Sequence, residues 1–287
     1  MLAAFTWESF KLLRRPAVWV CIGLLLALAV GLGYLTFYLV YTYAPSGPNS
    51  GLPRGVTLRD FKIALYPAAF VKYTLSTWDT LGGVFALILG VLSQGSEYGW
   101  GTVKTLYTQR PGRVALLAGK LGALSLAVLV LVLALFAIDA LSSYVVASID
   151  GKSTALPAGV DILKGLAAGW LIFGFWAVLG FFLATLFRQS ALAIGLGLAY
   201  AIVIEGIIFQ IAGNFGGDTV KRVLSWFPLA NTGYLSQSFG AAVPAGLART
   251  IAKPVADANH AVLVLLIYMT VFIALASVLV SRRDVTN

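Results

Sequence analysis

Residues 116–140 read LLAGKLGALSLAVLVLVLALFAIDA, and no charged residue occurs between Leu121 and Ile138. An α-helix rises about 1.5 Å per residue, so about 20 apolar residues cross a hydrocarbon core about 30 Å thick. This stretch therefore predicts a helix that spans a membrane.

The composition of the whole chain agrees with that prediction. Of the 287 residues, 60% are hydrophobic and only 11% are charged, against about 25% charged residues in soluble proteins. A soluble enzyme, a disordered protein and a disulfide scaffold are therefore excluded. With one cysteine, Cys21, and one histidine, His260, an intrachain disulfide, bis-histidine haem ligation and a Cys-rich metal site are excluded too. The net charge of +9 is better explained by lipid headgroups and topology than by nucleic acid.

Five further apolar runs pass the same length test, and strand-like alternation does not recur. The six runs are 17–41, 75–93, 116–140, 166–187, 191–212 and 261–280. The fold class predicted is therefore all-α integral membrane, with six transmembrane helices in a single domain over 1–287. The first run is too long for a cleaved signal peptide and is interpreted as a signal anchor.

Basic residues predict the orientation of these six helices. With both termini inside, the short inner segments carry a high density of lysine and arginine, as the positive-inside rule requires. These residues are Lys11, Arg14, Arg15, Lys104, Arg110, Arg113, Lys120, Arg188, Arg282 and Arg283. We therefore expect N-in, C-in topology, with residues 1–16 forming an amphipathic interfacial helix.

Two long segments are predicted on the outer side. In 42–74, Leu58, Phe61 and Leu65 recur at helical spacing, which indicates a helix on the outer surface. The segment 213–260 is too apolar for a free loop. We expect it to form short helices that dip into the interface before the last run.

Small residues recur every four positions in three of the runs. These are Gly23, Ala27 and Gly31; Gly165 and Gly169; and the neighbouring rows Ala191, Gly195, Ala199 and Ala193, Gly197, Ala201. Such rows permit close helix approach in lipid. They fit packing within one bundle or, for the first and fifth runs, a dimer interface.

The inner segment between the second and third runs reads EYGWGTVKTLYTQRPGR over 97–113. Trp100, Lys104 and Tyr107 share one face of a predicted helix over 97–110. Glu97 would lie in its first turn, and Arg110-Pro111 would end it. By periodicity alone, an ordinary interfacial connector with basic side chains reaching the headgroups fits as well.

The spacing Glu97-x-x-x-Gly101-Thr102, followed by Pro111-x-Arg113 and Lys120, resembles the permeases of the ABC type-2 exporter family. The stretches 8–16 and 226–231 are similar to that family's interfacial helix and outer segment. The resemblance implies that 97–110 is a coupling helix docked on a separate ATP-binding subunit. Its matching residues are Glu97, Gly101, Thr102, Pro111 and Arg113; Tyr98, Trp100, Lys104, Thr105 and Arg110 are added as docking contacts by position. It also implies a second permease copy, with a homodimer expected.

The chain carries no phosphate-binding loop of the form G-x-x-x-x-G-K-[S/T]. The nearest match, Gly151-Lys152-Ser153, lacks the first glycine and lies in a predicted outer loop, so it is interpreted as a surface turn. ATP and Mg²⁺ are therefore expected on the partner subunit, with no cofactor in this chain.

Three carboxylates, Asp79, Asp139 and Glu205, fall in the outer halves of the runs. One interpretation is structural: the two aspartates mark helix ends, and Glu205 is paired or protonated. The other is a pathway for a cationic or amphipathic substrate, continued by Phe209 and Gln210, because a charge in the bilayer should face protein or water.

Three functions remain to be compared. The leading one is the permease subunit of an ATP-driven exporter in a plasma or inner membrane, moving a small or amphipathic substrate such as a drug, peptide or lipid. The alternative is a non-transporting scaffold or sensor subunit bound to an ATPase. A membrane enzyme is poorly supported, because one histidine and no G-x-S-x-G motif offer no nucleophile–base pair.

Overall fold

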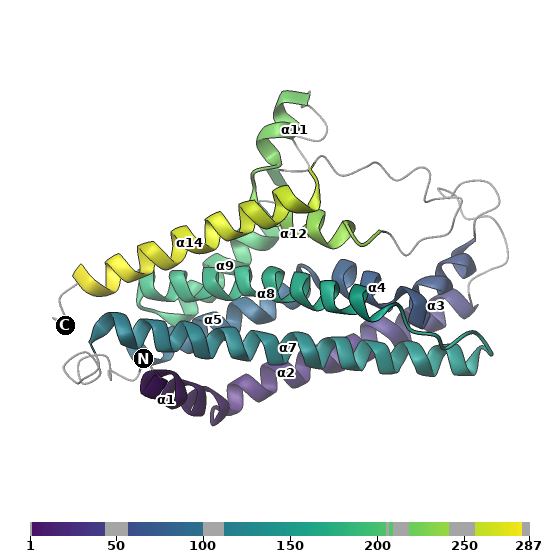
Figure 1. Cartoon of the computed structure of the whole chain (residues 1–287), viewed down its shortest axis with the longest axis horizontal. Coiled ribbons are helices and arrows are strands. Elements are labelled where there is room, and N and C mark those ends of the chain that lie inside the picture. Colours follow the sequence, from purple (N-terminus) through teal and green to yellow (C-terminus); the bar gives the residue numbers. More distant parts are fainter. Residues whose placement is uncertain are drawn as a thin grey trace.

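The fold consists of helices joined by turns. The computed structural model describes residues 2–43, 57–99, 112–204, 207–208, 218–240 and 256–282, and no strand occurs among them. The all-α class is therefore confirmed for this part of the chain. Figure 1 shows the long helices lying along one common direction, with α1 and the last turn of α14 at the same end.

Four stretches of the described residues are long and apolar enough to cross a membrane. They are Pro16–Tyr43, Val114–Ile149, Gly159–Phe187 and Ala258–Arg282. The first combines α2 (Pro16–Leu28), the π-helical η1 (Ala29–Thr36) and α3 (Phe37–Tyr43), and the others lie in α7 (Arg113–Ile149), α8 (Gly159–Phe187) and α14 (Ala258–Arg282). Each contains one of the predicted runs, and α7 continues nine residues past the end of its run at 140.

The second predicted run is not one straight helix. It divides into α4 (Phe70–Trp78) and α5 (Leu81–Gly99), and the axes of Pro67–Trp78 and Leu81–Gly95 differ by 59°. At the break, the N–H of Thr80 donates a hydrogen bond of 2.6 Å to Oδ1 of Asp79. An aspartate that bonds a neighbouring N–H competes with the helical pattern. The described chain thus has four candidate spans, or five if the bent pair counts as one.

The fifth predicted run, 191–212, is described only in its first part. There α9 (Ser190–Leu198) continues into η4 (Ala199–Ile204), and residues 209–212 lie outside the described part of the chain. The six-helix count therefore remains a prediction.

Shorter helices surround the long ones. At the amino terminus, α1 (Leu2–Leu13) lies within residues 1–16, where an interfacial helix was predicted. Between α3 and α4 lie the 3₁₀ helices η2 (Leu58–Leu65) and η3 (Pro67–Ala69), and before α14 lie α11 (Asp218–Leu224) and α12 (Pro228–Gln237). A capping box between Thr57 and Asp60 begins η2.

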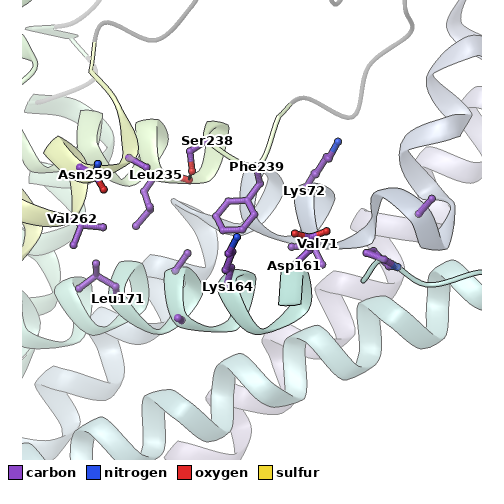
Figure 2. A pocket seen from close by; sticks show the side chains of 15 residues that line it. Val71, Lys72, Asp161, Lys164, Leu171, Leu235, Ser238, Phe239, Asn259 and Val262 are labelled. Atoms are coloured by element: carbon purple, nitrogen blue, oxygen red, sulfur yellow. Dashed lines mark hydrogen bonds between the residues drawn. The ribbon is translucent and has the colours of Figure 1, made fainter. Parts of the chain in front are cut away.

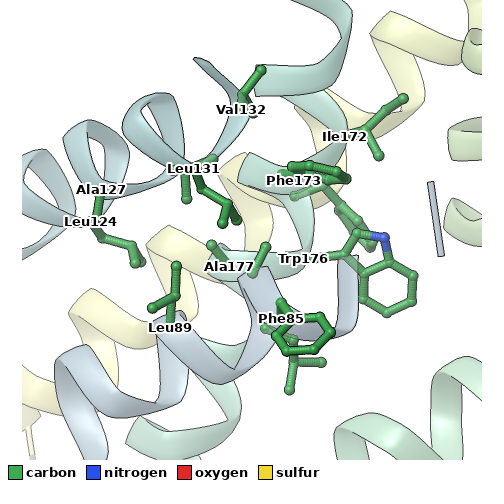
Figure 3. Packing of buried hydrophobic residues seen from close by; sticks show 14 of the residues in the cluster. Phe85, Leu89, Leu124, Ala127, Leu131, Val132, Ile172, Phe173, Trp176 and Ala177 are labelled. Carbon is green, nitrogen blue, oxygen red and sulfur yellow. The ribbon is translucent and has the colours of Figure 1, made fainter. Parts of the chain in front are cut away.

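The core forms where α5 crosses α8. A Cβ added to Gly90 would lie 1.9 Å from the carbonyl oxygen of Ala177, and one added to Gly180 would lie 2.1 Å from that of Leu87. The two backbones therefore touch directly, as small residues permit in membrane proteins. Around this contact, apolar side chains of α5, α7 and α8 interdigitate (Figure 3), with Trp176 fully buried.

The rows of small residues divide into packed and open ones. Gly165 and Gly169 face Phe136 of α7, and Gly197 faces Leu87 of α5, so these rows pack within the bundle. By contrast, a Cβ on Gly23 or Gly195 would meet no atom within 4 Å among the described residues.

Candidate functional site

The helices that flank the predicted coupling segment are described, and most of the segment is not. Glu97 and Tyr98 lie in the last turn of α5, and Arg113 is the first residue of α7. The helix α5 therefore continues through the position where a new helix was expected to begin at Glu97. The other predicted docking residues lie outside the described residues: Trp100, Gly101, Thr102, Lys104, Thr105, Arg110 and Pro111.

A buried polar contact joins α5 and α7 close to this segment. Nζ of Lys120 donates a hydrogen bond of 3.0 Å to Oε1 of Gln94, and both residues are 1% exposed. An ammonium group removed from water requires such partners. The contact therefore holds together the two helices that enter and leave the segment.

The turn between α1 and α2 also binds α5. Nη1 of Arg15 donates a hydrogen bond of 2.6 Å to the carbonyl oxygen of Leu92. One turn further along α5, a Cβ on Gly95 would lie 2.5 Å from Oγ of Ser190, at the start of α9. The last turns of α5 are thus in contact with α7, the α1–α2 turn and α9.

The helix α1 packs across the first turns of α7. A Cβ on Gly119 would lie 2.9 Å from Ala4, and one on Gly122 would lie 3.0 Å from Phe5. On α1, Glu8 is 3% exposed and pairs with Lys11 at 2.9 Å. The first turns of α7 are therefore in direct contact with α1.

The predicted substrate-pathway residues lie elsewhere. Asp139 is fully buried within α7, and its Oδ2 accepts a hydrogen bond of 2.7 Å from Oγ1 of Thr74. Asp79 lies at the break between α4 and α5. Glu205, Phe209 and Gln210 lie outside the described residues, so the structure places only the two aspartates.

A cavity of about 1030 Å³ lies between α4, α8, α12 and α14. Figure 2 shows Lys164 on α8 pointing toward Phe239, while Lys72 projects from α4. Asp161, Ser238 and Asn259 also line it, but Asp79 and Asp139 do not. The acidic lining expected for a cationic substrate is therefore not found around this cavity.

The lysines of the cavity were missed by the sequence reasoning. Both lie at ends of apolar runs predicted to face outward, where the positive-inside rule disfavours basic residues. Their position against the charge bias was the signal that could have identified them. That they lie on one cavity could not be predicted, because α4 and α8 are far apart in the sequence.

Four stretches of the described residues that are long and apolar enough to cross a membrane define a multi-pass membrane protein. The model of the ABC-2 family transporter protein matches residues 5–285, and the chain belongs to that family. Permeases of this family work with a separate ATP-binding subunit. The chain is also similar to "Uncharacterized protein YhcI" of Bacillus subtilis (strain 168), at 23% identity over 321 aligned positions that cover 98% of each chain.

Proposed function

We propose that the chain is the permease subunit of an ATP-driven exporter, worked through the segment between α5 and α7. The observation that carries this proposal is the buried Lys120–Gln94 contact, which fixes the two helices flanking the segment to each other. A partner that displaces the segment would move both helices together, because they cannot separate there without leaving a buried ammonium poorly satisfied.

In this mechanism the chain supplies the helices that move, and the partner supplies the energy. ATP and Mg²⁺ bind the separate ATP-binding subunit, which grips residues 97–110 on the inner side of a plasma or inner membrane. Closure of that subunit around ATP displaces α5 and α7, and α1 follows through its packing at Gly119 and Gly122. The orientation proposed is N-in, C-in with six transmembrane helices.

The substrate proposed is small or amphipathic. The chain presents a cavity of about 1030 Å³, which is of the size that takes up small molecules and is too small for a folded polymer. Apolar residues such as Val71, Leu171 and Leu235 share its lining with lysines, a mixture that suits a molecule with one polar end.

We also propose that two copies of the chain associate through α2 and α9. Gly23 and Gly195 are exposed and meet nothing within 4 Å among the described residues, whereas the adjoining row at Ala193 and Gly197 is buried in the bundle. A second copy would give the open row the close helix partner that small residues favour in lipid.

Co-purification tests the role of the segment. The chain is expressed with candidate ATP-binding subunits from the same cell, and the charge reversals Glu97→Lys and Lys104→Glu are compared with Lys152→Glu in the exposed turn after α7. Loss of the partner in the first two variants alone supports docking at 97–110. A partner retained by both variants would oppose it.

Turnover separates transport from scaffolding. If the complex hydrolyses ATP faster when a transported compound is added, the chain is a transport subunit. A stable complex whose ATP hydrolysis responds to no compound, and which moves none across a vesicle membrane, would instead identify a scaffold or sensor.

A further inference from the structure

The cavity between α4, α8, α12 and α14 combines an apolar wall with two cationic side chains. Val71, Leu171, Leu235 and Val262 contribute the apolar part. Lys164 of α8 points toward Phe239, and Lys72 projects from α4 with its ammonium directed away from Lys164 (Figure 2). Such a division of polar and apolar lining is typical of sites that orient an amphiphilic ligand.

The two lysines have no carboxylate partner within the described residues. Asp161 is the single acidic residue in the lining, and no ion pair joins it to Lys164 or Lys72 in that part of the chain. Two lysines against one aspartate leave the lining with a formal charge of +1. Lys164 and Asp161 are exposed and Lys72 is half-buried, so solvent screens this charge, and it favours an anion over a cation by a modest amount.

The position of Lys72 is set by its neighbours. A Cβ built on Gly240, which lies three residues after the end of α12 and has φ of +83°, would lie 3.5 Å from Nζ of Lys72. The ammonium group thus lies against the backbone just after α12, on the rim of the cavity. A Cβ at this position would be in ordinary van der Waals contact with the ammonium, and it is the positive φ that favours glycine there.

The helix ends add potential of the same sign. The first turns of α4, α8 and α14 all contribute to the lining, through Val71 and Lys72, through Asp161, and through Ala258 and Asn259. The amino-terminal end of a helix carries a partial positive charge. The lysines remain the main source of charge, and the helix ends reinforce them.

We infer that this cavity binds an amphiphile whose head is an anionic phosphate or carboxylate and whose tail is a hydrocarbon chain. The head lies at Lys164, where a charge-assisted hydrogen bond is available, and Lys72 on the rim adds to the positive potential. The tail lies along Leu171, Leu235 and Val262, which lie together at the other end of the cavity (Figure 2). This inference deepens the proposed function by naming a substrate class, but binding itself requires neither ATP nor a partner subunit.

Photolabelling tests the inference on the whole chain in nanodiscs of zwitterionic phosphatidylcholine. The probe is an alkyl phosphate with a diazirine in its chain, and adducts are mapped by mass spectrometry. We expect adducts on residues of the cavity lining, displaced by excess dodecyl phosphate and not by dodecyl trimethylammonium. Equal displacement by both compounds, or adducts spread evenly over the lipid-facing helices, would overturn the inference.

Three variants separate charge recognition from general damage. In the double variant Lys72→Gln, Lys164→Gln, half-maximal labelling should need about tenfold more probe, while Lys152→Gln, outside the cavity, should leave it unchanged. Asp161→Asn removes the opposing charge and should lower the concentration needed, an effect that misfolding cannot produce. Unchanged labelling in the double variant, or weaker labelling in Asp161→Asn, would refute the role of the lysines.

A last arm identifies the source of the ligand. Nanodiscs that contain phosphatidylglycerol supply a membrane lipid with the same head chemistry. Competition by this lipid, with the lysine dependence retained, identifies a membrane phospholipid as the ligand; no competition, with the same dependence, identifies a free amphiphile. If the labelling shows no dependence on the lysines while the complex still hydrolyses ATP and moves another compound, the proposed transport function stands and this inference fails. Lysine-dependent labelling of a chain that binds no ATP-binding subunit would support this inference and oppose the proposed function.

Discussion

Asp150 and Lys62, which are 88 residues apart in the sequence, form an ion pair of 2.8 Å. The same carboxylate accepts hydrogen bonds from the hydroxyls of Tyr66, at 3.1 Å, and Tyr38, at 3.3 Å. Asp150, the residue that follows α7, thus binds η2, the turn after η2, and α3. Burial and the neighbouring Asp150 raise the pKa of Tyr66 to about 12, so the phenol keeps the proton that it donates.

Asp150→Asn should weaken this junction. An amide carries no charge for Lys62 and retains one acceptor oxygen, so we expect the free energy of unfolding to fall by about 1–2 kcal/mol. Denaturant titration of the chain in detergent measures the effect. Tyr66→Phe, which keeps the ion pair and loses one hydrogen bond, should cost less; an equal or larger loss would show that the ion pair contributes little.

The same junction predicts a dependence on pH. Burial raises the pKa of Asp150. The hydrogen bond and the charge of Lys62, together with the hydrogen bonds from Tyr66 and Tyr38, outweigh this effect and hold the pKa below its ordinary value. A carboxylate with a lowered pKa stabilises the fold above its unfolded pKa, about 3.9, and loses that contribution as the pH falls through the folded value. Between pH 5 and pH 3 the wild type should therefore lose more stability than Asp150→Asn. Parallel losses in the two proteins would contradict this linkage.

The long helices were predictable because their signal is local. A run such as 121–138 has no conformation in lipid other than a helix, since every backbone group must find its partner within the segment. Its continuation to Ile149 was missed because residues 141–149 include Ser142 and Ser143, which lowered the apparent length of the apolar run. In the structure the hydroxyl of Ser143 donates to the carbonyl oxygen of Ala140, within the helix.

The features of the site depend on contacts between distant segments. Asp79 was interpreted as a helix end or a pathway residue, and the 59° bend next to it was not foreseen. Nothing in the sequence pairs Lys120 with Gln94 or brings Lys72 and Lys164 to one cavity. The motif that indicated the family lies mostly in residues outside the described part of the chain, so its docking role stays a prediction.

Gln94→Leu should impair coupling more than assembly. Leucine cannot accept the hydrogen bond from Lys120, and loss of one partner of a buried ammonium should cost about 1–3 kcal/mol. Because the contact fixes the helices on both sides of the docking segment, the ATP-binding subunit should still co-purify while transport per ATP hydrolysed falls. Gln94→Glu restores an acceptor and should recover coupling; wild-type coupling in Gln94→Leu would exclude this role.

Two glycines on α8 provide a matched test of the core. A methyl group on Gly180 would lie 2.1 Å from the carbonyl oxygen of Leu87, whereas one on Gly174 would lie 3.5 Å from the flexible Cε of Met269. Gly180→Ala should therefore destabilise the protein by at least about 2–3 kcal/mol, because backbone cannot move aside as a side chain can. Gly174→Ala should be tolerated and gain slightly in helix propensity. Thermal unfolding of the two variants in the same detergent decides between direct backbone contact and loose packing.

Substitutions on α9 test the proposed association of two copies. Gly195 is exposed and meets nothing within 4 Å among the described residues, while a Cβ on Gly197 would lie 2.7 Å from Leu87. Gly195→Ile should therefore leave the stability of the single chain nearly unchanged and convert a dimer to a monomer, because the branched side chain keeps the partner helix at a distance. Gly197→Ile should lower stability instead, since it overfills the bundle. Light scattering in detergent and single-molecule photobleaching in nanodiscs measure the copy number; a wild-type chain that is already monomeric at high concentration, or a Gly195→Ile variant that remains dimeric, would exclude this surface as the interface.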